Sequence, residues 1–234
     1  MDVKYCLPIV EASVADTVAR IQRNLEEYAL FELWLDYLEA VDTGFVSGLC
    51  EEYRERLLFV TRRLDLRKSV LAKSLRRELL AAAVSGGALV DLDFRTQSDD
   101  VKWYCDLYEG RTFLLSYHNY EETPSDEELL VLIEQMQKYE PCMYKFSTYC
   151  GKPSDAVRLL HFMLALKSAG LKCIVLGMGE YGKLMRVFGT LWGNEFVFAP
   201  EERSGASALG QLTRRELDSV LQVLASKPSV IAGC

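Results

Sequence analysis

Histidine is scarce in this chain: His118 and His161 are the only two among 234 residues. The seven cysteines are scattered, and no two of them form a C-x-x-C pair. With so few nitrogen ligands and no ligand spacing, a zinc site is not expected, and no other metal or cofactor is called for. An odd number of unpaired thiols is typical of a reducing compartment, so we expect free cysteines and a cytoplasmic location.

Long apolar stretches are also missing. No run of about 18 uninterrupted apolar residues occurs, so we expect no membrane span. An acidic residue, Asp2, comes early and no apolar core follows it, which argues against a signal peptide. The 27 basic and 34 acidic residues give a net charge of −7, which argues against nucleic acid or an anionic membrane as a partner. No proline-rich or low-complexity linker divides the chain, and we expect a single domain over residues 1–234.

What the chain does contain is a regular alternation of apolar strand-like runs with helix-like stretches. The expected strands are Val3–Val10, Leu30–Leu35, Leu57–Thr61, Ala88–Leu92, Arg111–Ser116, Met143–Ser147, Lys172–Gly177 and Glu195–Ala199. Their apolar residues run continuously, as in parallel strands that are covered on both faces. Eight strands with matching helices predict a (β/α)8 barrel, an α/β fold. A doubly wound sheet is the alternative, which the periodicity alone does not exclude.

Local signals mark several of the intervening helices. Capping boxes begin at Ser125, with Glu128 three residues later, and at Thr213, with Glu216 three residues later. Another helix covers Val157–Leu166 and ends before a glycine. We also expect a helix that begins near residue 68 and closes at the glycine pair 86–87.

The active-site groups of a barrel lie at the carboxyl ends of its strands. Lys145 and His118 lie at the ends of successive expected strands, flanked by aromatic residues. A buried lysine can attack a ketone to form an imine, and an imidazole can move the proton next to it. A strand-end lysine more often reaches solvent, and a strand-end histidine can simply bond a backbone carbonyl. His161, among apolar residues of a helix, is expected to have a packing role.

Other strand ends supply polar side chains that could bind a ligand. Arg186, beyond the seventh strand, could hold a carboxylate with two hydrogen bonds, near the loop of Ser207 and Gln211. The remaining candidates are Glu32, Asp36, Arg63, Asp91, Asp93, Met178 and Phe198. The segment 177–182 matches G-x-G-x-x-G, but it lies late in the chain and an acidic residue about twenty positions on, Glu195, opens a strand instead of closing one. This is a poor signal for a dinucleotide site.

Taken in order, these residues resemble the type I 3-dehydroquinate dehydratase family over nearly the whole chain. The matching segments are E-L-W-L-D at 32–36, T-R-R at 61–63, S-Y-H-N-Y-E-E-T-P at 116–124, K-F-S at 145–147, G-K-L-M-R-V-F-G at 182–189 and S-A-L-G-Q at 207–211. The segment around His118 is the closest and most specific of them.

The resemblance implies a hydro-lyase of the shikimate pathway, which supplies aromatic amino acid biosynthesis. Lys145 would form an imine with the C3 ketone of 3-dehydroquinate, and His118 would remove the C2 proton and then protonate the departing C1 hydroxyl. By the same resemblance, Arg186, Ser207 and Gln211 would hold the carboxylate. Glu32 and Arg63 would bind ring hydroxyls, and Met178 and Phe198 would wall the ring. No metal or nucleotide is implied, and relatives are often homodimers.

Three positions depart from the family's pattern. Trp34 stands where the motif of the second strand has an arginine, Arg67 where the third has a glutamate, and Met185 where a serine precedes Arg186. We therefore expect a divergent enzyme. Two rivals stay open, a Schiff-base aldolase on the same barrel and a relative that binds quinate-type ligands with little or no turnover.

Overall fold

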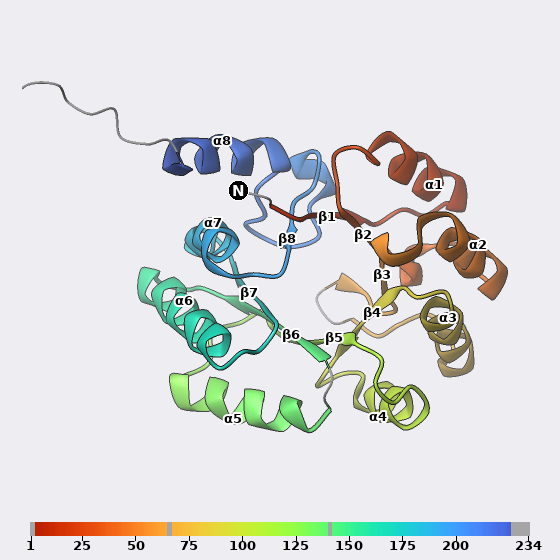
Figure 1. The fold of residues 1–234 in the computed structure, drawn as a ribbon, viewed down its shortest axis with the longest axis horizontal. Coiled ribbons are helices and arrows are strands. Elements are labelled where there is room, and N and C mark those ends of the chain that lie inside the picture. Colours follow the sequence, from red (N-terminus) through yellow and green to blue (C-terminus); the bar gives the residue numbers. More distant parts are fainter. Residues whose placement is uncertain (1–2, 65–66, 140–141, 226–234) are drawn as a thin grey trace, which may run out of the picture.

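Eight parallel strands form the centre of the molecule. The computed structural model describes residues 3–64, 67–139 and 142–225. In this part of the chain the strands are β1 (Tyr5–Ile9), β2 (Leu30–Trp34), β3 (Leu57–Val60), β4 (Leu89–Asp93), β5 (Phe113–Asn119), β6 (Cys142–Tyr149), β7 (Cys173–Met178) and β8 (Val197–Phe198). Their order in the sheet is β7-β6-β5-β4-β3-β2-β1-β8. Because neighbours follow one another along the chain and β1 pairs with β8, the sheet curls into a barrel (Figure 1). The predicted (β/α)8 barrel is confirmed, with shifted strand boundaries.

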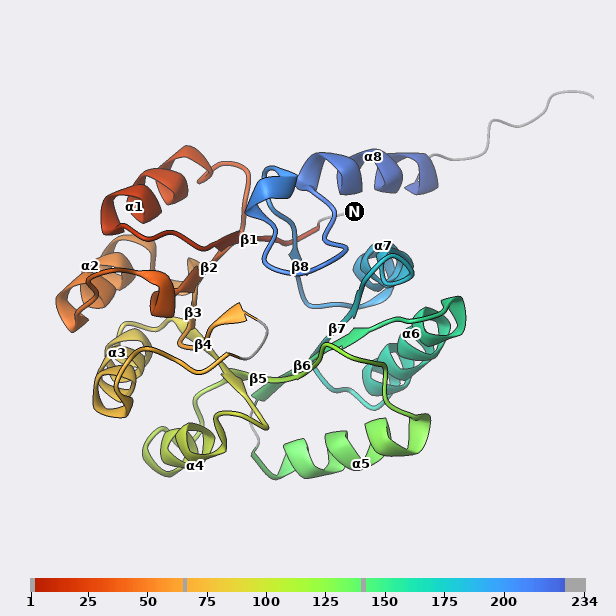
Figure 2. The same cartoon turned by 180° about the vertical axis from the view of Figure 1, so that it is seen from behind.

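Helices surround the barrel, as Figure 2 shows from the opposite side. In the described residues they are α1 (Val14–Arg23), α2 (Thr43–Tyr53), α3 (Lys73–Ser85), α4 (Ser98–Leu107), α5 (Asp126–Met136), α6 (Pro153–Ser168), α7 (Lys183–Trp192) and α8 (Arg214–Ala225). Both expected capping boxes are present, at Ser125 and at Thr213. The helix expected from near residue 68 begins only at Lys73. None of the described helices has the length and apolar character needed to cross a bilayer.

A side chain closes the barrel where the strands do not. β7 and β8 share no strand pairing, because β8 is only two residues long. The amide of Asn194 fills the gap: its Oδ1 accepts from the Val175 N–H at 2.8 Å, and its Nδ2 donates to the Val175 carbonyl at 3.1 Å. The Glu195 N–H also donates to the Cys173 carbonyl at 3.2 Å, so the Asn194 side chain and one backbone hydrogen bond together replace a strand pairing. We call this place the β7–β8 seam.

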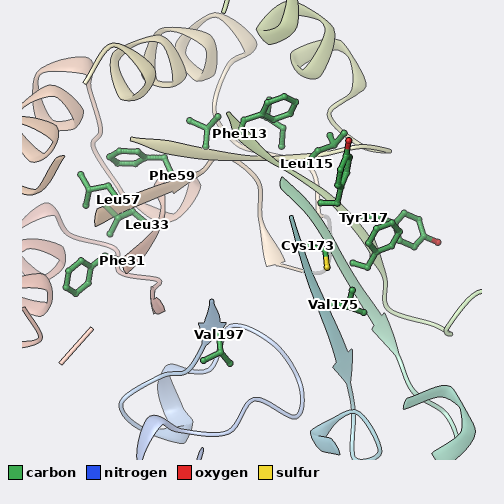
Figure 3. Close-up of a cluster of buried hydrophobic side chains, with 14 of the residues drawn as sticks. Phe31, Leu33, Leu57, Phe59, Phe113, Leu115, Tyr117, Cys173, Val175 and Val197 are labelled. Atoms are coloured by element: carbon green, nitrogen blue, oxygen red, sulfur yellow. The ribbon is translucent and has the colours of Figure 1, made fainter. Parts of the chain in front are cut away.

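Two apolar layers hold the fold. The outer layer fills the space between strands and helices, with side chains such as Phe31, Phe59 and Phe113 (Figure 3). The inner layer is smaller and lies inside the barrel, built from Cys6, Leu58, Leu114, Ile174, Leu176, Phe196 and Phe198. Successive residues of a strand point to opposite faces, so each strand serves both layers.

Gly182 brings α7 directly over the end of β7. A Cβ built on Gly182 would lie 2.3 Å from the carbonyl carbon of Gly177 and 2.6 Å from the amide nitrogen of Met178. These are backbone atoms that have little freedom to move aside. Gly182→Ala should therefore lower the free energy of unfolding by about 3 kcal/mol, measured by chemical denaturation.

Gly48→Ala is the matched control. Gly48 is exposed on α2, and a Cβ there would have no atom within 4 Å. Alanine has the better helix propensity, so this variant should gain about 1 kcal/mol. Similar losses in both variants would contradict the close packing of α7 on β7.

Candidate functional site

The polar centre follows from the alternation of side chains along the strands. On three neighbouring strands an apolar residue points into the barrel, and polar residues follow at steps of two toward the carboxyl end. These series are Leu89–Asp91–Asp93, Leu114–Ser116–His118 and Met143–Lys145–Ser147. The strand register sets Asp93 beside Ser116, and Ser116 beside Lys145. Polar side chains from β4, β5 and β6 therefore meet above the inner apolar layer.

Asp91 is the hub of this centre. It is fully buried, and its two oxygens accept from both terminal nitrogens of Arg62, at 2.8 and 3.1 Å. The same carboxylate accepts from Lys145 Nζ at 2.9 Å and from the Ser116 hydroxyl at 2.6 Å. Burial alone would raise the pKa of Asp91, but Arg62 and Lys145 hold it well below its usual range. Asp91 is thus a fixed anion on β4 that links the segment after β3 with β5 and β6.

Lys145 is buried in the barrel, with 4% of its surface exposed. Its amine lies between Asp91 and Glu32, whose Oε1 is 3.5 Å away, and 4.3 Å from the centre of the Phe198 ring. The other oxygen of Glu32 accepts from the indole N–H of Trp34 at 2.9 Å. The amine is therefore held at a defined position by two carboxylates and an aromatic face.

His118 is equally enclosed. Its Nδ1 lies 2.9 Å from Asp93 Oδ2, its Nε2 lies 3.4 Å from Arg62 Nη2, and its ring stacks with Tyr120. Burial lowers the pKa of His118 below its ordinary value, and the Arg62 cation lowers it further against the opposing effect of Asp93. A neutral imidazole at neutral pH is able to accept a proton.

A small cavity of about 20 Å³ lies next to these groups. It is lined by Glu32, Trp34, His118, Tyr120, Lys145, Ser147, Leu176, Arg186, Phe198, Ser207, Ala208 and Gln211. Arg186, in the first turns of α7, has only 1% of its surface exposed, and its three guanidinium nitrogens have no hydrogen-bond partner among the described residues. Burial lowers the pKa of Arg186 to about 10, so it is still a cation at neutral pH. An unpaired buried cation on a cavity wall is suited to an anionic ligand.

The loop after β8 covers the cavity from the other side of the seam. Within it, the Gln211 side chain accepts from the Ser207 N–H at 2.8 Å and donates to the Ser207 hydroxyl at 3.2 Å. Gly210 has a φ of 78°, and its backbone packs on Gly179 of the loop after β7. Ser207 and Gln211 are thereby held together opposite Arg186.

The structure brings most of the sequence candidates together, with three exceptions. Asp36 does not line the cavity, and its carboxylate instead accepts from the Val70 and Leu71 N–H groups. Arg63 does not line the cavity: its Nη1 donates to the Asp36 carbonyl, and its guanidinium lies over Tyr37. The arginine that reaches the centre is its neighbour Arg62. Met178 is buried at the end of β7 but does not line the cavity, where Leu176 does.

Two contributors to the centre, Arg62 and Trp34, are not among the sequence candidates for catalysis or binding, and both are buried. The sequence holds a signal for both: residues 58, 60 and 62 share one face of an extended chain, and so do residues 32 and 34. The same period excludes Arg63, which falls on the other face.

Metal ligation has no support in the described ranges, where no group of three or more His, Cys, Asp or Glu side chains is arranged to hold an ion. The charged groups of the centre instead pair with one another. A buried amine, a neutral imidazole and an unpaired arginine around one cavity can together perform covalent and proton-transfer chemistry on an anionic carbonyl compound.

Comparisons with known proteins point to one family. The model of the type I 3-dehydroquinase family matches residues 5–228. A 3-dehydroquinate dehydratase of Methanococcus maripaludis is 30% identical over 224 residues, which cover 94% of this chain and 99% of that protein. A 3-dehydroquinate dehydratase of Coxiella burnetii is 26% identical over 222 residues, covering 94% and 92%.

Solved structures show the same fold. The crystal structure of 3-dehydroquinate dehydratase from Geobacillus kaustophilus superposes with a TM-score of 0.80 at 23% identity, covering 98% of this chain and 93% of that one. A type I enzyme from Clostridium difficile, crystallised with covalently modified comenic acid, gives 0.78 at 21% identity, with 95% and 92% covered.

The two buried arginines should respond to substitution in opposite ways. Arg186 is an unpaired buried cation, so Arg186→Met should raise the free energy of unfolding by about 1 kcal/mol or more. Arg62→Met removes the guanidinium that makes two hydrogen bonds with the buried Asp91 carboxylate. This variant should lower the free energy of unfolding by about 3 kcal/mol. Denaturation of the two variants in parallel checks both signs. An equal loss in both would mean that Arg186 has a structural partner.

Proposed function

The chain belongs to the type I 3-dehydroquinase family, and we propose that it converts 3-dehydroquinate to 3-dehydroshikimate and water. The observation that carries this proposal is the buried, unpartnered Arg186, which faces the same cavity as the Lys145 amine and the His118 ring. A substrate with a carboxylate at one end and a ketone at the other fits these three groups. The reaction would serve the shikimate pathway, and so aromatic amino acid biosynthesis.

Lys145 is the proposed nucleophile. Its Nζ attacks the C3 carbonyl of the substrate, and loss of water gives an imine that draws electrons away from C2. The contacts with Asp91 and Glu32 support this role, because they hold the amine at the floor of the cavity. Phe198, whose ring lies 4.3 Å from Nζ, forms one wall for the substrate ring. The proposed family role of Met178 as a second wall passes to Leu176, which lines the cavity.

His118 is the proposed general base and acid. It removes the C2 proton, and the electrons of the C–H bond move into the enamine. The protonated ring then gives the proton to the C1 hydroxyl, which leaves as water. A second water hydrolyses the imine, releases 3-dehydroshikimate and restores the Lys145 amine. The lowered pKa of His118 supports the first step, since the ring is neutral when substrate arrives.

Binding of the substrate divides between two sides of the cavity. We assign the carboxylate to Arg186, with Ser207 and Gln211 on the loop after β8. We assign the ring hydroxyls to Glu32. Arg62, which lies beside His118 but is not part of the cavity wall, takes the role that the resemblance gave to Arg63 in this proposal. Trp34 holds one oxygen of Glu32 and lies under Arg62, and so narrows the choice of hydroxyls that this side accepts.

The proposal includes a single catalytic domain, a cytoplasmic location and a homodimer. Five cysteine side chains are described; none of them is in a disulfide and four are buried, which supports a reducing compartment. Sedimentation at several protein concentrations tests the dimer.

Borohydride trapping tests the imine. Purified protein mixed with 3-dehydroquinate and borohydride should gain the mass of a reduced ligand, mapped by peptide analysis to Lys145. Lys145→Ala should lose both the adduct and turnover. His118→Ala should keep the adduct and lose about 10²- to 10⁴-fold in kcat, the range typical of acid–base catalysis.

Lys102→Ala is the matched control, since Lys102 is exposed on α4. It should keep both adduct and turnover. Binding of the ligand without an adduct in the wild type would refute the imine mechanism and favour a protein that only binds quinate-type ligands. Turnover with an adduct on another lysine would refute the assignment to Lys145.

The loss of kcat/KM on the acidic side of its pH profile should occur at an unusually low pH. A base works only when unprotonated, and burial and Arg62 lower the pKa of His118, so the ring stays neutral to a lower pH than a free imidazole. kcat/KM should therefore fall with a midpoint below about 6.5. Arg62→Met removes the cation and should move the midpoint upward. A wild-type midpoint at or above the ordinary imidazole value would contradict the neutral buried base.

A further inference from the structure

Asp93 is held by its surroundings more tightly than an ordinary ion-pair partner. Its Oδ1 accepts three hydrogen bonds from the turn after β4: from the Arg95 N–H at 3.2 Å, the Thr96 N–H at 2.8 Å and the Thr96 hydroxyl at 2.8 Å. The Asp93 N–H donates to the side chain of Gln97 at 3.0 Å. The carboxylate is fully buried. Its plane cannot turn, and Oδ2 is the oxygen that meets His118 Nδ1.

The other ring nitrogen faces a group of the opposite character. Arg62 Nη2 lies 3.4 Å from Nε2, and a guanidinium can donate but never accept a hydrogen bond. An ionised carboxylate, in contrast, can only accept. Asp93 therefore requires a proton on Nδ1, and Arg62 favours a lone pair on Nε2. Both neighbours select the same neutral tautomer.

We propose that Asp93 is a positioning residue that fixes the Nδ1–H tautomer of His118 and so keeps on Nε2 the lone pair that takes the substrate proton. This inference deepens the proposed function and rests on it for the identity of the proton. The glutamate of the family's third-strand motif is absent from this chain, where Arg67 stands in its place. The carboxylate that contacts the base comes from the end of β4.

Asp93→Asn gives a sharp test, because the turn dictates how the new amide must lie. Three donors at the Oδ1 position demand the amide oxygen there, so the NH₂ group has to face His118. An NH₂ group donates, which favours the lone pair on Nδ1 and the proton on Nε2, against the effect of Arg62 at Nε2. The base then carries its proton on the catalytic side. We expect a loss of about a thousandfold or more in kcat, a KM near the wild-type value and a retained borohydride adduct on Lys145.

The tautomer itself is measurable without turnover. The chain has only two histidines, so long-range ¹⁵N–¹H spectra of ¹⁵N-histidine-labelled protein contain two ring systems, and His161→Gln assigns them. The wild type should show Nδ1–H for His118, and Asp93→Asn should show Nε2–H. Asp100→Asn is the matched control, a buried carboxylate on α4 that pairs with Arg76 and Arg77 away from the centre. It should leave the tautomer and kcat unchanged.

The possible outcomes separate the two proposals. A wild-type Nε2–H tautomer overturns this inference, even if Asp93→Asn fails to fold. An unchanged tautomer or kcat in a folded Asp93→Asn also overturns it. An Nδ1–H wild type that switches in Asp93→Asn, but that never turns over 3-dehydroquinate, supports the orienting role and refutes the proposed function alone.

Discussion

The buried carboxylate of Asp91 is the interaction on which the centre of the barrel depends. A lone anion inside a protein is strongly unfavourable, and this one is stable because Arg62, Lys145 and Ser116 all donate to it. The same contacts set the positions of those donors. Lys145 is held beneath the cavity, and Arg62 is held beside His118. One anion thereby arranges an amine and an imidazole that come from different strands.

Most charged side chains around Asp91 are paired with an opposite charge, but Arg186 is not paired with one in the described part of the chain. The inner centre is nearly neutralised: Asp91 and Glu32 face Lys145 and Arg62, and Asp93 faces His118. Arg186, a few residues into α7, has no such partner among the described residues. Burying an unpaired cation is unfavourable, and an anion that binds there would remove this cost. The buried position of Arg186 would therefore strengthen the binding of an anionic ligand.

Much of the fold was predictable, because it rests on local patterns. The apolar runs located all eight strands, and the reciprocal capping pairs at Ser125 and Thr213 located two helix starts. The site was predictable only in part. His118 and Lys145 follow from their strand ends, but Arg63 was chosen over Arg62, although a period of two from Leu58 selects Arg62. The same period places Trp34 on the face of Glu32, but the hydrogen bond between them depends on side-chain conformations that the sequence does not specify. The glycines at 177 and 182, which mimic a dinucleotide motif, instead allow a backbone contact between β7 and α7.

Under the proposed function, the β7–β8 seam links ligand binding to the stability of the closed barrel. Asn194 ties the seam on the side of the strands, while Arg186 and Gln211 lie on the two segments that flank it above. A carboxylate gripped by both of these side chains is a further tie across the same gap. By thermodynamic linkage, an interaction that stabilises the closed barrel also strengthens ligand binding, and ligand binding stabilises the closed barrel. Under the proposed function, an empty barrel would therefore open at the seam more often than a filled one, and bound substrate would protect the chain from proteolysis.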